Sequence, residues 1–266
     1  MTEVVKANTA DLVTVLAWLE QEYAEDDGEG FWCNRAVISR AQDDGDLWVI
    51  RRDGEAIAFQ VGDYAPDIVS VRKEHRRQGL GGALFAASLA RAQADNVNVL
   101  SIECSPRSSW PFWRRHGFER YGDLSEWGRI TARRVLARTF DIPEGLLVAK
   151  VAIGFYPEGA VHGDDVPQIA VHEVRGERLD DGSIFLERRV IGLCDDEPQG
   201  RDLAIKIEID GHLRCFCKAK YEEAEEAGVT RDWKGGAFYV DVIEAANSDK
   251  NPVAPATTNS APSRTR

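Results

Sequence analysis

The chain has 266 residues, 43% of them hydrophobic and 29% charged, a length that suits about two domains. Its longest nearly apolar stretch, 146–156, contains Lys150 and is well short of the roughly 20 residues that cross a bilayer, so we exclude a membrane span. Residues 1–6 do not resemble a targeting sequence, so we expect a cytoplasmic protein. With 33 basic and 45 acidic residues the net charge is −12, which disfavours nucleic acid as a general partner.

The first 140 residues alternate between strand and helix periodicity. A strand near 4–7 leads to Asn8, which suits a helix N-cap, and apolar residues then recur at helical spacing. The glutamates of this helix, among them Glu22, are expected to face water. Asp53-Gly54 predicts a hairpin between two strands. The further elements expected are a helix over 34–42, strands over 47–50, 56–59, 68–71 and 97–104, helices over 79–94 and 110–116, and a strand starting at Phe118.

From about Asp141 the pattern becomes strand-like and is broken by Asp-Gly turns. Asp181-Gly182 and Asp210-Gly211 each separate two alternating segments, so they predict two hairpins. One helix over 218–227 and a last strand over 237–243 follow. This half of the chain is therefore expected to be mainly β.

The most specific segment of the sequence lies between the strand at 68–71 and the helix at 79–94. It is Val71-Arg72-Lys73-Glu74-His75-Arg76-Arg77-Gln78-Gly79-Leu80-Gly81-Gly82-Ala83-Leu84-Phe85. The start of a helix presents unpaired N–H groups and a partial positive charge, and glycine lets a ligand approach them without a Cβ in the way. We predict a pyrophosphate site here. Neither G-x-x-x-x-G-K-S/T nor G-x-G-x-x-G with a following acid is present, and a glycine-rich turn that merely begins a packed helix is the alternative.

Two blocks resemble the motifs of one enzyme superfamily. Arg76-x-x-Gly79-x-Gly81 resembles the R/Q-x-x-G-x-G/A signature of the GNAT superfamily of acyl-CoA-dependent N-acyltransferases. Residues 109–118, Ser-Trp-Pro-Phe-Trp-Arg-Arg-His-Gly-Phe, resemble the family's later A-x-x-F-Y-x-x-x-G-F motif. The order of strands and helices matches as well. The resemblance covers about residues 1–140.

This resemblance implies an α/β (α+β) fold with a mixed central sheet flanked by helices. We therefore expect a GNAT-like acyl-CoA-binding domain over 1–140 and a mainly β accessory domain of unknown function over 141–246. Residues 247–266 are rich in Ser, Thr, Pro and Asn with almost no large apolar residue, so this tail is predicted to be disordered.

The resemblance also implies which residues hold acetyl-CoA. The backbone of Val69 and Val71 would pair with the pantetheine arm of the co-substrate. The residues implied to hold the pyrophosphate are Arg76, Arg77, Gln78, Gly79, Gly81 and Gly82.

The sequence departs from the family at Trp113. The family's aromatic hydroxyl at this position is assigned as the acid that protonates the leaving thiolate, whereas an indole can only donate a hydrogen bond. A thiolate with a pKa near 8.5 can leave at neutral pH without full protonation, so transfer does not require that acid. Trp113 is kept as a catalytic candidate.

A base for the acceptor amine is the other catalytic requirement. An alkyl amine with a pKa of about 10.4 is almost fully protonated at pH 7, so a base or a chain of waters is useful. Glu103, at the end of the strand over 97–104, is the first candidate, followed by Asp67 and Glu74. A solvated carboxylate is the alternative for each, and water alone could relay the proton.

The five cysteines predict neither disulfides nor a metal site. Their number is odd, and only Cys215 and Cys217 are close in sequence, without a second pair of ligands. Cys104 is interpreted as a buried strand residue rather than a nucleophile. We expect reduced thiols and no metal.

The leading hypothesis is an N-acetyltransferase that moves an acetyl group from acetyl-CoA to an amine of a small molecule or peptide, with residues 141–246 helping to select or present the acceptor. One alternative is a GNAT-fold protein that binds CoA with weak or no turnover. Another is an acetyltransferase acting on an RNA-linked amine, suggested by eight arginines against three acidic residues over 105–138. A homodimer is kept open, and no membrane partner is expected.

Overall fold

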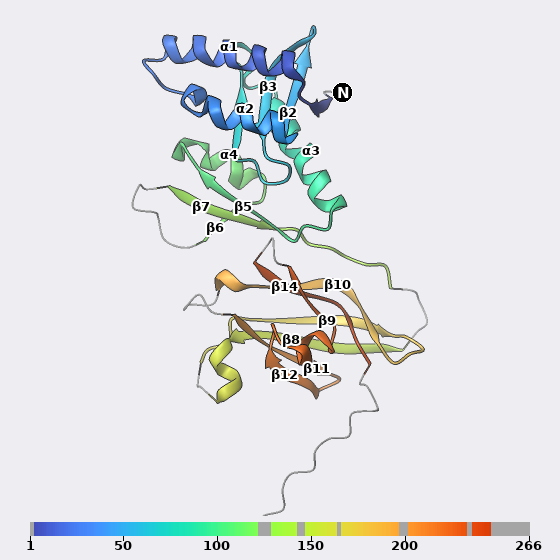
Figure 1. Ribbon diagram of the computed structural model, residues 1–266. Helices are drawn as coiled ribbons and strands as arrows, with labels where there is room; N and C mark the ends of the chain where they lie inside the picture. Colours follow the sequence, from blue (N-terminus) through green and yellow to red (C-terminus); the bar gives the residue numbers. More distant parts are fainter. Residues whose placement is uncertain are drawn as a thin grey trace, which may run out of the picture. The chain divides into compact units, whose positions relative to one another are not determined.

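The structure is a computed structural model that describes residues 3–121, 129–142, 147–163, 166–196, 202–232 and 236–245. The tail over 247–266, predicted to be disordered, lies outside the described residues. The chain divides into two compact units (Figure 1). The first contains Met1–Arg138 with the short segments Leu193–Asp195 and Arg231–Phe238, and the second contains Thr139–Gly192, Asp196–Thr230 and Tyr239–Arg266.

The first helix, α1 (Thr9–Glu25), begins at a complete capping box. The Asn8 side chain accepts from the Asp11 N–H, and the Asp11 carboxylate accepts from the Asn8 N–H at 2.7 Å. Two of the N–H groups that a helix start leaves unpaired are thereby satisfied. The predicted cap at Asn8 is confirmed. The helices in the described part of the chain are too short or too polar to span a bilayer.

A four-stranded antiparallel sheet lies next to α1. Its order is β1 (Val4–Lys6), β2 (Leu47–Arg52), β3 (Glu55–Val61) and β4 (Ile68–Val71). Asp53 and Gly54 both have positive φ, 52° and 85°, which is the two-residue hairpin geometry that the sequence predicts. Strand β4 is the outer strand of this sheet.

The rest of the first unit supplies a second sheet and two helices. Strands β5 (Val99–Cys104), β7 (Ile130–Val135) and β6 (Glu119–Arg120) form a three-stranded sheet in that order, while α3 (Leu80–Ala94) precedes β5 in the chain and α4 (Trp110–Arg115) lies between β5 and β6. The α/β architecture expected for this half is confirmed. Its described strands divide between two hydrogen-bonded sheets, with β4 at the edge of one and β5 at the edge of the other.

Apolar side chains cover both faces of the β1–β4 sheet. Val15 and Trp18 of α1 and Ile38 of α2 (Arg35–Asp44) pack with Phe59 on one face. On the other face, Leu84 of α3 packs with residues of β2 and β3. The sheet is therefore sandwiched between helices, as Figure 1 shows. A third cluster joins α3, α4 and the β5–β7 sheet, and it consists of Phe85, Ala92, Leu100, Ile102, Cys104, Trp113, Phe118, Ile130, Ala132 and Leu136.

The second unit is mainly β, as expected. The sheet order is β12-β11-β8-β9-β10-β14-β13. The strands are β8 (Val148–Pro157), β9 (Ala170–Arg178), β10 (Ile184–Leu193), β11 (Leu203–Ile209), β12 (His212–Lys218), β13 (Val229–Asp232) and β14 (Ala237–Ile243). By the division above, the last residue of β10, the end of β13 and the start of β14 count with the first unit. Both predicted hairpins form, since β9 pairs with β10 and β11 with β12 across their Asp-Gly turns.

The helix predicted over 218–227 is wrong in extent. Helix α5 covers only Glu222–Glu225, because Lys218 still belongs to β12, where it pairs with Ala204, and Gly228 adopts a φ of 95° just before β13. A run of glutamates has adequate helix propensity, but strand pairing at one end and a left-handed glycine at the other limit the helix to one turn.

The Asp11 carboxylate also anchors α1 to the sheet. It accepts from Arg51 Nε at 2.7 Å and from Arg51 Nη2 at 2.5 Å, and only 4% of its side chain is exposed. These hydrogen bonds, opposed by desolvation, hold the pKa of Asp11 below its ordinary value of 3.8. The bidentate geometry is the strong form of such a pair.

Replacing this carboxylate should destabilise the first unit. We expect Asp11→Ala to lower the free energy of unfolding by about 2–4 kcal/mol, because it removes a cap and leaves Arg51 without its partner. The carboxylate's contribution is present above pH 3.8 and is lost as the pH falls through the lowered pKa of the folded protein. Denaturant titrations would measure this, with the exposed Asp43→Ala as a control expected to change stability by less than about 0.5 kcal/mol. Equal losses in both variants would contradict the assignment.

Candidate functional site

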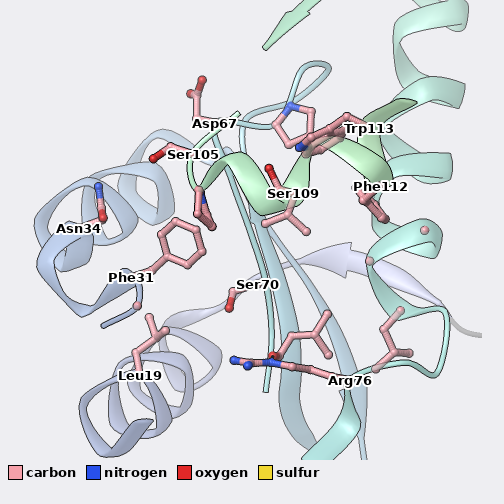
Figure 2. A pocket seen from close by; sticks show the side chains of 18 of the residues that line it. Leu19, Phe31, Asn34, Asp67, Ser70, Arg76, Ser105, Ser109, Phe112 and Trp113 are labelled. Carbon is pink, nitrogen blue, oxygen red and sulfur yellow. The ribbon is translucent and has the colours of Figure 1, made fainter. Parts of the chain in front are cut away.

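A cleft of about 1280 Å³ lies within the first unit (Figure 2). Its walls come from α1, the 3-10 turn η1 (Phe31–Asn34), strand β4, the start of α3, and the segment from the end of β5 to α4. Of the twelve site candidates named from the sequence, ten line it. They are Asp67, Val69, Val71, Arg76, Arg77, Gly79, Gly81, Gly82, Glu103 and Trp113.

The start of α3 faces the cleft without a side-chain cap. Its N-cap residue is Gly79, in a left-handed conformation with φ 81°. A Cβ there would meet nothing within 4 Å, so glycine is favoured by the backbone conformation and not by crowding. In contrast to α1, no side chain of the described residues caps the first N–H groups of α3. These amides remain available to a ligand.

Gly81 and Gly82 follow in the first turn of α3, where their backbone is helical. A Cβ on Gly81 would lie 3.6 Å from the Phe112 ring, and one on Gly82 would lie 3.7 Å from the His116 ring, both ordinary contacts. Glycine inside a helix costs about 0.5–1 kcal/mol relative to alanine. Neither φ nor packing within the chain explains these two glycines, whereas close approach of a ligand would.

Strand β4 offers an open backbone edge beside this helix start. The Arg72 N–H donates to the Ile57 carbonyl, which makes that pair a hydrogen-bonded one in the ladder with β3. Because bonded pairs alternate along an antiparallel ladder, Val69 and Val71 direct their N–H and C=O groups away from β3. The Val71 carbonyl accepts from Arg76 Nε at 2.8 Å.

The Arg76 guanidinium is already engaged with its own chain. Besides the Val71 carbonyl, it bonds Glu22 Oε2 through Nη2 at 2.7 Å, and the other oxygen of Glu22 accepts from the Lys73 N–H at 2.7 Å. The prediction that Glu22 faces water is therefore wrong, since only 13% of its side chain is exposed. The sequence shows that α1 has helical spacing. It does not show that the face carrying Glu22 packs against a turn about 50 residues later in the chain.

Arg77 and Gln78 differ in where their side chains lie. Arg77 lines the cleft with a left-handed φ of 62°. The Gln78 side chain does not line it and instead accepts from Arg52 Nη1 at 2.9 Å. The structure thus separates the Gln78 side chain from the other residues predicted to hold a pyrophosphate.

Two of the three candidate bases line the cleft. Glu103 pairs with Arg129 at 2.8 Å, both side chains being about half exposed. Asp67 has a raised pKa, caused mainly by burial and then by the nearby Asp46 carboxylate. Glu74 lies outside the lining and pairs with Arg72 at 2.7 Å.

Trp113 is packed among aromatic rings on the cleft wall. It is 7% exposed and makes edge-on contacts with Phe85, Phe112 and Phe118, at centroid distances of 5.8, 4.8 and 5.5 Å. This geometry fits its place in the third core cluster. Its side chain fixes the wall against which a ligand would lie.

Two further lining residues were not anticipated from the sequence. His116 lies beside Gly82, and the Ser109 hydroxyl is buried in the wall near the Cys104 thiol, whose pKa is raised mainly by burial. Both belong to the block 109–118, so the later motif was the signal that could have found them. Among the described residues, no group of three or more His, Cys, Asp or Glu side chains is placed to hold a metal ion.

Comparison with known families agrees with this geometry. Residues 43–120, which run from the end of α2 to β6, match the family model described as acetyltransferase (GNAT) domain. The first unit contains a GNAT acetyltransferase domain. The match includes the turn before α3 and the block 109–118, and it does not extend into the second unit. No curated protein sequence matches the chain.

Solved acetyltransferases resemble about half of the chain at low identity. Ard1 from Thermoplasma volcanium has 18% identity and a TM-score of 0.41, covering 50% of this chain and 97% of its own. PaiA N-acetyltransferase from Thermoplasma acidophilum, in complex with coenzyme A, has 14% and 0.41, covering 51% and 99%. A ribosomal-protein-alanine N-acetyltransferase from Brucella melitensis has 20% and 0.39, covering 50% and 99%.

Removing the Glu22 carboxylate should loosen the turn that precedes α3 in the GNAT domain. We expect Glu22→Ala to lower stability by about 1–3 kcal/mol and to speed hydrogen exchange at the Lys73 amide, because that amide and Arg76 lose a partly buried acceptor. Amide exchange and denaturant titration would measure both effects. Glu20→Ala, an exposed change on the same helix, is the control. Unchanged exchange at Lys73 would show that Glu22 does not hold the turn.

Proposed function

We propose that the first unit is an N-acetyltransferase that takes acetyl-CoA and transfers its acetyl group to an amine. The observation that carries this proposal is the uncapped start of α3, with Gly79, Gly81 and Gly82 facing a cleft that also exposes the edge of β4. Such a helix start attracts a phosphate through its N–H groups and its dipole.

The pyrophosphate of acetyl-CoA fits the first turn of α3. Each charge-assisted hydrogen bond from a backbone amide contributes about 1.5–3 kcal/mol. Arg77, in the turn before α3, adds positive charge, while Arg76 holds that preceding turn in place through Glu22 and the Val71 carbonyl. In this proposal Gly81 and Gly82 donate their backbone N–H groups to the pyrophosphate, which can approach closely because glycine has no Cβ.

The pantetheine arm fits along the outer edge of β4. The open N–H and C=O groups of Val69 and the N–H of Val71 can pair with its two amides as a neighbouring strand would. This alignment would carry the thioester from the start of α3 into the cleft, towards the wall formed by Trp113 and Ser109.

The chemical step is attack of a neutral amine nitrogen on the thioester carbonyl carbon. The new C–N bond forms, the C–S bond breaks, CoA leaves as a thiolate and the amine loses one proton. Glu103 and Asp67 are the carboxylates that line the cleft and can accept that proton, directly or through water. The indole N–H of the packed Trp113 is not acidic, so in this proposal the thiolate leaves with solvent as its proton source.

The acceptor proposed is an amine on a small molecule or peptide, with the second unit helping to select or present it. An RNA-linked amine has less support, because several arginines of the block 105–138 make contacts within the chain: Arg134 donates to the His116 carbonyl, Arg138 to the Gln93 carbonyl, and Arg129 pairs with Glu103. The buried, hydroxyl-free Trp113 favours one competing function, in which the fold binds CoA without turnover.

A charge reversal in the first turn of α3 tests the proposal. We expect Gly81→Glu to weaken CoA binding tenfold or more, a loss of about 1.4 kcal/mol, because it places a carboxylate where the pyrophosphate would lie. Ala86→Glu is the matched control, since it adds the same charge on the exposed face of the same helix. Calorimetry gives the affinities. Thiol release from acetyl-CoA with a panel of amines gives the turnover.

The outcomes separate the proposed functions. Amine-dependent thiol release by wild type and Ala86→Glu, lost in Gly81→Glu, supports acetyl transfer. Tight CoA binding with no release on any amine would favour the binding protein instead. Equal CoA affinity in the two folded variants would place the site elsewhere.

A further inference from the structure

His116 lies at the start of α3 although it comes from the end of α4. Its ring atoms Cε1 and Nε2 lie 3.7 Å from the position that a Cβ on Gly82 would occupy, so this edge of the imidazole faces the first turn of the helix. The residue also lines the cleft. Figure 2 shows the neighbouring Phe112 pointing towards the same helix start.

Two aromatic rings hold the imidazole in this orientation. The Phe112 ring lies 4.5 Å and the Phe85 ring 5.0 Å from its centroid, at interplanar angles of 61° and 60°. The His116 carbonyl accepts from Arg134 Nη1 at 2.6 Å, which fixes the backbone as well. Within the part of the chain that the structure describes, no hydrogen bond occupies either ring nitrogen. A half-buried donor is therefore held ready beside the uncapped amides of α3.

Two arginines supply the charges that act on the His116 imidazole among the described residues. Arg115 precedes it at the end of α4 and Arg134 faces it from β7, while Gly82 and Phe85 bring no charge from α3. Burial first, and then these two arginines, lower the pKa of the imidazole below 6.5. In the free protein this shift favours the neutral imidazole, and a bound anion would oppose the shift.

We propose that His116 is a phosphate-binding residue whose imidazole donates to the anionic group held at the start of α3 and takes up a proton from solvent when that group binds. This inference rests on the proposed acetyl-CoA site and adds a residue and a proton to it. A bound phosphate supplies the missing negative charge, so it favours the protonated ring.

The sign of the pH dependence follows from this coupling. The ligand binds more tightly as the pH falls through the pKa of the bound form, and the gain levels off below the lower pKa of the free form. For each pH unit that separates the two pKa values, binding at low pH is about tenfold tighter than at high pH. Above both values the affinity does not depend on this group.

Dephospho-CoA is the suitable probe, because it keeps the pyrophosphate but lacks the 3′-phosphate, whose own second ionisation lies near pH 6. Calorimetry between pH 5 and pH 8.5, in buffers with different ionisation enthalpies, should show affinity rising towards low pH with net proton uptake. Pantetheine, which has no phosphate, should show neither. The imidazole Cε1–H signal of His116 in NMR titrations should report a higher pKa with dephospho-CoA than without it.

Two variants identify the responsible histidine. His116→Gln keeps an N–H donor near the Nε2 position but cannot take up a proton, so dephospho-CoA should bind it with an affinity that no longer rises at low pH. His75→Gln is the matched control: His75 lies in the turn before α3, contacts Arg52 at 3.2 Å and does not line the cleft, so the wild-type pH dependence should persist.

The results distinguish this inference from the proposed function. If dephospho-CoA binds to His116→Gln with the wild-type pH dependence, or the His116 signal titrates identically with and without ligand, the inference is wrong while the acyl-CoA site stands. If wild type binds no dephospho-CoA at any pH, the proposed site fails and the inference fails with it. The NMR titration needs no substitution, so it decides the question even where a variant does not fold.

Discussion

The Glu22 carboxylate on α1 holds the turn that joins β4 to α3, and both of these elements form walls of the cleft. One oxygen accepts from the Lys73 amide and the other from Arg76, whose guanidinium also bonds the Val71 carbonyl. A single side chain on α1 therefore sets the end of β4 and the path into α3. The uncapped amides of that helix face the cleft because this path is fixed, and the open edge of β4 lies beside them for the same reason.

The first turn of α3 is less stable than the sequence could have made it. Two helical glycines and an uncapped start are each unfavourable for an isolated helix. By contrast, α1 has a complete capping box and no glycine. The packed rings of Phe85, Phe112 and Trp113 make up part of this difference by fixing α4 against α3. A ligand that binds the backbone amides of this turn would offset the lost helix stability.

Features of the fold that depend on neighbouring residues could be predicted from the sequence. The Asn8 cap, the Asp53-Gly54 hairpin and the Asp210-Gly211 hairpin are each specified within a few residues. The glycine signature before α3 also points to the cleft that the structure forms. Features that depend on distant partners could not be predicted. Glu22 meets a turn about 50 residues away, the Gln78 side chain turns to Arg52, and α5 is shortened by the pairing of Lys218 with Ala204.

We propose that the uncapped amides at the start of α3 bind the pyrophosphate of CoA. The most direct test is to follow the amide signals of the full chain by NMR while CoA is added. We expect the largest downfield shifts and the strongest added protection from exchange on residues 79–82, because these amides would gain charged acceptors, whereas the next amide, that of Ala83, already donates to the Gly79 carbonyl. Saturable CoA binding that leaves these amides unshifted and moves signals elsewhere would contradict it.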